Sequence, residues 1–195
     1  MERETKETSV VVTWTPGRGA SRIVLEGALE GSEPTGAHDQ VAGRVAFTRH
    51  MLATLAHWSG HELQLTARSK DGLLHHLLED ACIALGQCIR ASLPTTPIER
   101  TAHVVLPMDD ALVLVALDVV DRPYYEGPLP DATMDHLLRS LAQEARMTLH
   151  VQVLRGRDAH HIVEAAFKGL GLSLRRALEP RASLLSTKGD VAVRP

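Results

Sequence analysis

The chain has 195 residues and a formal net charge of −3, and 44% of its residues are hydrophobic while only 3% are aromatic. This length fits one domain or two small fused halves, and the hydrophobic content is ordinary for a globular protein. The weak negative charge argues against nucleic-acid binding. No apolar run could span a membrane and the first residues lack the apolar core of a signal peptide, so we expect a cytoplasmic protein.

The first half of the chain alternates strand-like and helix-like segments. Gly, Pro, Ser and Asp are frequent at 31–43, which predicts a loop there. In chain order, the predicted elements are strands at 10–14 and 21–29, a helix at 45–58, a strand at 62–67 and a helix from 75 to about 93.

The second half repeats this series after a proline-containing link at 94–97. The predicted elements are strands at 101–106 and 111–119, a helix at 134–145, a strand at 148–154 and a helix ending near 178. We therefore expect a first half-repeat at 1–93, a second at 94–180 and a polar tail at 181–195. Each half is predicted to be a small mixed sheet with two helices on one face, which makes the fold α+β.

Two cysteines, Cys82 and Cys88, lie in the first motif helix. Six residues separate them, so they point to different faces of the helix and match neither a zinc nor a redox spacing. We interpret them as small buried side chains in a reducing compartment.

A His-His-x-x-Glu motif opens a helix at 75–79 and again at 160–164, with 85 positions between the copies. Residues three and four apart share one face of a helix, so each Glu can lie beside its own His pair. One copy alone would more often consist of capping or surface groups. Two copies in register indicate a duplicated site, and imidazole with carboxylate suits a divalent transition metal.

A further histidine lies upstream of each motif, in similar helices that are offset by 86 positions. Each half therefore offers three His and one Glu, enough for two metals with open positions. Which histidine joins which metal stays open. The candidate ligands are His50, His75, His76, Glu79, His136, His160, His161 and Glu164.

Short segments along nearly the full chain carry a family resemblance. They are Arg-Glu-Thr-Lys-Glu-Thr at 3–8, Phe-x-x-His-Met-Leu at 47–52, the two His-His-x-x-Glu motifs with the residues that follow them, Pro-Met-Asp-Asp-Ala-Leu at 107–112, Arg-Pro-Tyr at 122–124, Thr-Leu-His at 148–150 and Ser-Thr-Lys-Gly at 186–189. Their order and spacing are highly specific. In these segments the chain resembles the imidazoleglycerol-phosphate dehydratase family.

The resemblance implies a fold of the ribosomal-protein-S5-domain-2-like type and a hydro-lyase of histidine biosynthesis. The implied reaction converts imidazoleglycerol phosphate, a small phosphorylated imidazole, to imidazoleacetol phosphate. It also implies two divalent metal ions per subunit, expected to be Mn²⁺, and a homo-oligomer of 24 subunits with metals at subunit contacts.

The resemblance assigns roles to residues that composition would leave on the surface or in a disordered tail. Glu7 becomes a candidate acid or base, with the ligand residues Glu79 and Glu164 as alternatives. A guanidinium fork suits phosphate oxygens. The phosphate-binding residues that the resemblance implies are Arg100, Arg122, Lys168, Ser186 and Lys188.

The chain departs from the family pattern next to several of these residues. Leu73 and Leu74 stand where acids usually precede the first His pair. Trp58 replaces a histidine linked to phosphate binding, Arg49 replaces an aspartate, and Asp121 replaces a glycine. These changes keep two alternatives open, which are a divergent metal-dependent lyase acting on a related phosphorylated substrate and a non-catalytic metal-binding assembly subunit.

Overall fold

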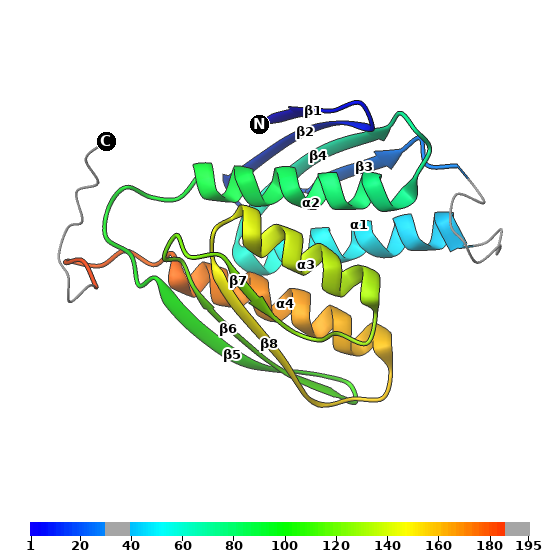
Figure 1. Cartoon of the computed structure of the whole chain (residues 1–195). Coiled ribbons are helices and arrows are strands. Elements are labelled where there is room, and N and C mark those ends of the chain that lie inside the picture. The colour runs from blue at the N-terminus through cyan, green and yellow to red at the C-terminus, as the bar shows by residue number, and fades with distance from the viewer. Residues whose placement is uncertain (30–39, 186–195) are drawn as a thin grey trace.

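The computed structural model describes residues 1–29 and 40–185 and shows two four-stranded sheets with four helices between them (Figure 1). The elements of the first half are β1 (Glu2–Glu4), β2 (Thr8–Pro16), β3 (Arg22–Glu26), α1 (Gln40–Ser59), β4 (His61–Ser69) and α2 (Leu74–Ala91). Those of the second half are β5 (Thr101–Met108), β6 (Ala111–Asp118), β7 (Tyr124–Glu126), α3 (Ala132–Glu144), β8 (Thr148–Arg155) and α4 (Ala159–Ala177).

The two sheets have the same topology. Their strand orders are β1-β2-β4-β3 and β5-β6-β8-β7. In each sheet the first two pairings are antiparallel and the last, β3 with β4 or β7 with β8, is parallel. This correspondence confirms the predicted α+β fold built from two duplicated halves.

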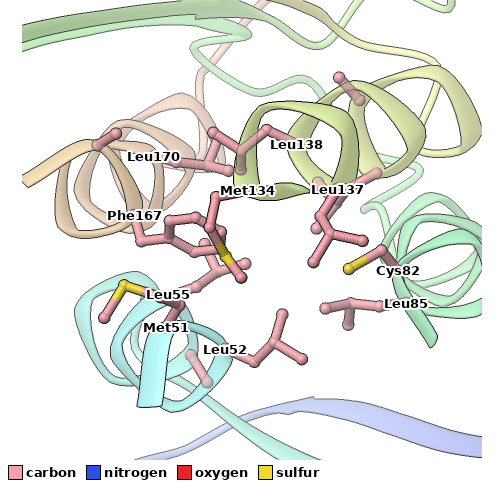
Figure 2. Packing of buried hydrophobic residues seen from close by; sticks show 14 of the residues in the cluster. Met51, Leu52, Leu55, Cys82, Leu85, Met134, Leu137, Leu138, Phe167 and Leu170 are labelled. Carbon is pink, nitrogen blue, oxygen red and sulfur yellow. The ribbon is translucent and has the colours of Figure 1, made fainter. Parts of the chain in front are cut away.

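The core lies between the helices and the inner faces of the sheets. Strand residues alternate between buried and exposed, as in β2, where Val10, Val12 and Trp14 point inward. Each half covers one face of its sheet with its two helices, and the halves pack helix against helix, α1 on α4 and α2 on α3. Figure 2 shows side chains from all four helices, among them Met134 and Phe167, meeting in the space between them.

Two glycines allow the helix pairs to approach closely. A Cβ on Gly86 of α2 would lie 2.6 Å from the backbone oxygen of Leu141 in α3. A Cβ on Gly171 of α4 would lie 2.6 Å from the backbone oxygen of Leu55 in α1. These glycines are 85 positions apart, the spacing of the His-His-x-x-Glu motifs, so the close contact is itself duplicated.

Three elements differ from the prediction. The short edge strands β1 and β7 were not predicted, because three residues are too few to show a period. Helix α1 begins at Gln40 rather than Val45, so the predicted loop at 31–43 is partly wrong, and its residues 31–39 lie outside the described residues. No helix in the described part of the chain is long and apolar enough to cross a membrane.

Candidate metal centres and active site

The first motif helix, α2, contributes two side chains to a ligand group. His75 and Glu79 are one turn apart, with His75 Nε2 3.4 Å from Glu79 Oε2. Helix α3 supplies His136, whose Nε2 lies 3.0 Å from Glu79 Oε1. One ligand atom from each of the three residues lies within 4.8 Å of the others. Two imidazoles and a carboxylate at this distance suit a divalent transition metal.

The second motif helix, α4, builds a matching group. His160 Nε2 lies 3.2 Å from Glu164 Oε2, and His50 Nε2 from α1 lies 3.5 Å from the same oxygen. The three ligand atoms again fall within 4.8 Å of one another. The predicted ligands His50, His160 and Glu164 are therefore brought together.

Both groups are shared between the halves of the chain. Each takes a histidine and a glutamate from the motif helix of one half and a histidine from the first helix of the other half. The arrangement follows from the packing of α2 on α3 and of α1 on α4. The sequence left the pairing of the candidate ligands open, and the structure brings six of the eight into these two groups.

The remaining predicted ligands, His76 and His161, do not join either group. His76 Nδ1 lies 2.6 Å from Asp71 Oδ2 and 3.7 Å from Glu7 Oε2. His161 Nδ1 lies 2.7 Å from Asp110 Oδ1. The hydrogen bonds to the imidazoles are the main reason that the pKa of Asp71 and of Asp110 falls to about 2.

The same hydrogen bonds raise the pKa of His76 and of His161 above the ordinary imidazole value. Both rings bind their carboxylates through Nδ1. Nε2 of His76 has no ion-pair partner among the described residues, whereas Nε2 of His161 lies 3.5 Å from Asp109 Oδ2. A ring held through Nδ1 can offer Nε2 to a metal ion.

Glu164 has a neighbour that Glu79 lacks. Lys168 Nζ lies 2.9 Å from Glu164 Oε1. Burial alone would raise the pKa of Glu164, but the Lys168 hydrogen bond and charge, together with His50, lower it below its usual value. The ammonium also lies 3.4 Å from the Met108 sulfur and 5.8 Å from the centre of the Trp58 ring.

One of the predicted phosphate-binding arginines, Arg100, lies away from Lys168 within one subunit. The backbone amide of Arg100 donates to Ala177 at the end of α4, nine residues beyond Lys168, which is roughly 14 Å along the helix. Arg122 is exposed just after β6. The other two predicted phosphate residues, Ser186 and Lys188, lie outside the described residues.

Arg100 is held in an unusual conformation. Its φ is 67°, a left-handed value that costs a side-chain-bearing residue energy. Its Nε lies 2.8 Å from Asp118 Oδ1, a contact without hydrogen-bond geometry, and its Nη1 donates to the Leu185 carbonyl at 3.0 Å. The guanidinium is therefore directed toward the segment that leads to Ser186.

The contact of Asp71 with His76 was not predicted from the sequence, and Asp110 was noted only within the family segment at 107–112. A carboxylate that meets a histidine 5 or 51 positions away leaves no fixed spacing to recognise. The sequence gives one indirect indication. Leu73 and Leu74 replace the acids expected before the His pair, which indicates that another acid nearby contacts these histidines.

Known proteins give a consistent assignment. A profile of the imidazoleglycerol-phosphate dehydratase family matches residues 43–174. The chain is 38% identical over 202 residues to imidazoleglycerol-phosphate dehydratase of Pyrobaculum calidifontis, covering 96% of both chains. It is 42% identical over 188 residues to the enzyme of Akkermansia muciniphila, covering 88% of this chain and 94% of the relative.

Solved structures agree. The crystal structure of IGPD from Pyrococcus furiosus in complex with (S)-C348 is 35% identical, with a TM-score of 0.77, and the match covers 98% of this chain and 100% of that one. The Staphylococcus aureus imidazoleglycerol-phosphate dehydratase is 23% identical with a TM-score of 0.70, and supports the fold. The chain belongs to the imidazoleglycerol-phosphate dehydratase family.

Proposed function

We propose that this chain dehydrates imidazoleglycerol phosphate to imidazoleacetol phosphate in histidine biosynthesis, and that the reaction depends on divalent metal. The relatives that match it over nearly the full chain bear the name of this enzyme. One observation carries the metal dependence: two His, His, Glu groups recur at equivalent places in the two halves, each with ligand atoms within 4.8 Å.

The donor set of each group fits a divalent ion, and we propose two Mn²⁺ ions per subunit. His75, Glu79 and His136 would hold one ion, and His50, His160 and Glu164 the other. Imidazole and carboxylate ligands are compatible with manganese and with its neighbours in the first transition row. The chemistry supplied by a bound ion is Lewis acidity, which lowers the pKa of a coordinated substrate imidazole.

The protein must also move a proton, because the reaction removes hydrogen from a carbon atom and a hydroxyl from its neighbour. No carbonyl activates that carbon, so the substrate imidazole must accept the electron pair. Glu7 is the proposed acid or base, since its exposed carboxylate lies 3.7 Å from His76 without serving in either ligand group. Glu79 and Glu164 remain alternatives.

Phosphate binding is assigned to Arg100, Arg122, Lys168, Ser186 and Lys188. Arg100 lies beside the last residue of α4, whereas Lys168 lies nine residues earlier in that helix. We therefore propose that residues of more than one subunit surround the substrate. His76 and His161, each bound to a carboxylate through Nδ1, support the same assembly, since each would complete a metal site of a neighbouring copy through Nε2. The proposed assembly is the homo-oligomer of 24 subunits that the family resemblance implies.

A second candidate is a lyase acting on a related phosphorylated substrate. It is favoured by Trp58, whose ring centre lies 5.8 Å from the Lys168 ammonium where relatives are expected to carry a phosphate-binding histidine. A tryptophan attracts the ammonium through its ring face, but its indole has a single donor. The side chain beside Lys168 therefore differs from a histidine in shape and in hydrogen bonding.

The test is turnover of imidazoleglycerol phosphate by the purified protein with added Mn²⁺ and with a chelator. We expect formation of imidazoleacetol phosphate only with metal. Bound Mn²⁺ without turnover would refute this substrate. Restored turnover in Trp58→His would then support the related-substrate alternative, because it would identify position 58 as the specificity change.

A further inference from the structure

The loop between β4 and α2 holds the carboxylate of Asp71 by both oxygens. Asp71 Oδ1 accepts hydrogen bonds from the Leu73 amide at 2.9 Å and the Ser69 hydroxyl at 3.0 Å. Its other oxygen, Oδ2, lies 2.6 Å from Nδ1 of His76. Gly72 closes the loop in a left-handed conformation (φ +82°), and its amide donates to Ser69 Oγ at 2.9 Å. The loop therefore fixes the acid in front of the imidazole.

In the second half, a carboxylate from a different loop makes the same contact with the motif histidine. Asp110 Oδ2 accepts from the amides of Arg157 at 2.6 Å and Asp158 at 3.2 Å, while Oδ1 lies 2.7 Å from His161 Nδ1. Asp110 lies between β5 and β6, not before the motif helix. At the repeat spacing of 85, the counterpart of Asp71 is Gly156. The two halves therefore present a carboxylate to equivalent histidines from loops at different places in the repeat.

We propose that Asp71 is a positioning residue that fixes the tautomer and orientation of His76. A carboxylate accepts a hydrogen bond from Nδ1–H, which keeps the proton on Nδ1 and leaves the Nε2 lone pair free for a metal. Leu73 and Leu74, directly before the His pair, offer no such group. The inference rests on the proposed function, in which His76 is a metal ligand.

Two other acids near His76 do not take this role. Glu7 lies 3.7 Å from the same Nδ1, too far for a hydrogen bond, and its side chain is exposed. Asp80 is held by Arg3 at 2.8 Å and by Thr8. The atoms of Glu7, Asp71 and His76 do lie within 4.8 Å of one another, so direct cation binding by this trio is the competing explanation.

The hydrogen bonds around Asp71 predict an unusual order of effects. In Asp71→Asn, the loop donors Leu73 and Ser69 keep the amide oxygen, so the NH₂ group faces His76. Nδ1 must then accept, the proton moves to Nε2, and the ligand atom is blocked. We therefore expect Asp71→Asn to weaken metal binding more than Asp71→Ala, and Asp71→Glu to restore part of it. A merely structural role would make alanine the worse replacement.

The experiment is a Mn²⁺ titration of the full-length protein, with free Mn²⁺ followed by electron paramagnetic resonance. We expect two ions per subunit in the wild type and one of the two binding steps weakened about 10- to 100-fold in Asp71→Asn. The matched control is Glu26→Gln, which removes an equal charge from an exposed ion pair with Arg68. Thermal unfolding in chelator checks that every variant is folded.

Three results would overturn the inference. If Asp71→Asn binds Mn²⁺ as tightly as Glu26→Gln while the wild type binds two ions, positioning is refuted and the proposed function stands. If the wild type binds three ions and Asp71→Asn loses one completely, Asp71 is itself a ligand. If the wild type binds none, the proposed function fails and this inference fails with it.

Discussion

The two ligand groups share their residue types and helix positions but differ in what lies beside the glutamate. In the part of the chain that the structure describes, Glu79 ion-pairs only with His75 and His136, and its side chain is 30% exposed. Glu164 is 11% exposed and also holds Lys168 at 2.9 Å. The position equivalent to Lys168 in the first half is Ile83. Duplication has kept the ligands and changed what surrounds them.

This difference suggests unequal roles for the two groups. A metal at the first group would meet a carboxylate beside which the described residues place no Lys or Arg. A metal at the second group competes with Lys168 for Glu164, and a substrate phosphate that attracts the ammonium would relieve that competition. We therefore expect phosphate and metal to favour one another at the second group but not at the first.

The largest expected effect comes from removing the histidine that each group takes from the other half of the chain. His136→Ala should abolish binding at the α2 group and His50→Ala at the α4 group, each leaving the other ion in place. The loss should exceed the roughly 10- to 100-fold effect of an outer hydrogen-bond partner. Metal content per subunit after dialysis measures it. Loss of both ions from either variant would show that the groups are not independent.

Acid should remove both ions together, because each half has a histidine hydrogen-bonded to a carboxylate. Asp71 and Asp110 raise the pKa of His76 and His161, so protons compete with metal already above about pH 6.5. In the metal-free subunit, the pH dependence of folding stability has the opposite sign. A raised pKa stabilises the folded state at low pH, and this contribution disappears as pH rises through the folded-state pKa.

The pH prediction is checked by following metal content, assembly size and turnover from about pH 8 to about pH 5. All three should fall on acidification. A protein that keeps its metal and its rate at the acid end would contradict the account of His76 and His161.

Enlarging Gly86 or Gly171 should disturb one ligand group at a time. Alanine at either position places a methyl group against a backbone oxygen, with a cost of about 1–3 kcal/mol for overpacking. Chemical denaturation measures the free energy of unfolding. Gly43→Ala in α1 is the matched control, because a Cβ there meets nothing within 4 Å. Equal stability of all three variants would argue against the close helix contacts.

The smallest effect is expected from substituting Lys168, or Ile83 at the equivalent position of the first half. Lys168→Met should raise metal affinity at the α4 group by up to about fivefold, which corresponds to roughly 1 kcal/mol, the upper end for a single ion pair that solvent can reach. It should also raise the Michaelis constant for the phosphorylated substrate. Ile83→Lys should weaken metal binding at the α2 group. Mn²⁺ titration of both variants tests this, and unchanged affinities would show that Lys168 is irrelevant to metal binding.

Much of the fold could be read from the sequence because the repeat is long. The family, the hydro-lyase class and the duplicated α+β architecture are confirmed. The strands β1 and β7 were missed because three-residue edge strands carry no periodic signal. The early start of α1 was missed because helix boundaries depend on tertiary contacts, here the burial of Val41.

The residue types of the candidate ligand groups could be predicted from the sequence, but which histidine meets which glutamate could not. Equal spacing identified the eight ligand candidates, yet spacing cannot show that His136 meets Glu79 while His50 meets Glu164. That depends on how the halves pack, through the glycine contacts of α2 and α4. The phosphate-binding roles stay predictions, since Ser186 and Lys188 lie outside the described residues and Arg100 lies at the far end of α4 from Lys168.

Anomalous diffraction from crystals grown with Mn²⁺ tests the central claim most directly. We predict two ions per subunit, one held by His75, Glu79 and His136 and the other by His50, His160 and Glu164. An ion held by His50 together with Glu79, both from the first half, would contradict the shared arrangement. Density at neither group would contradict the metal assignment itself.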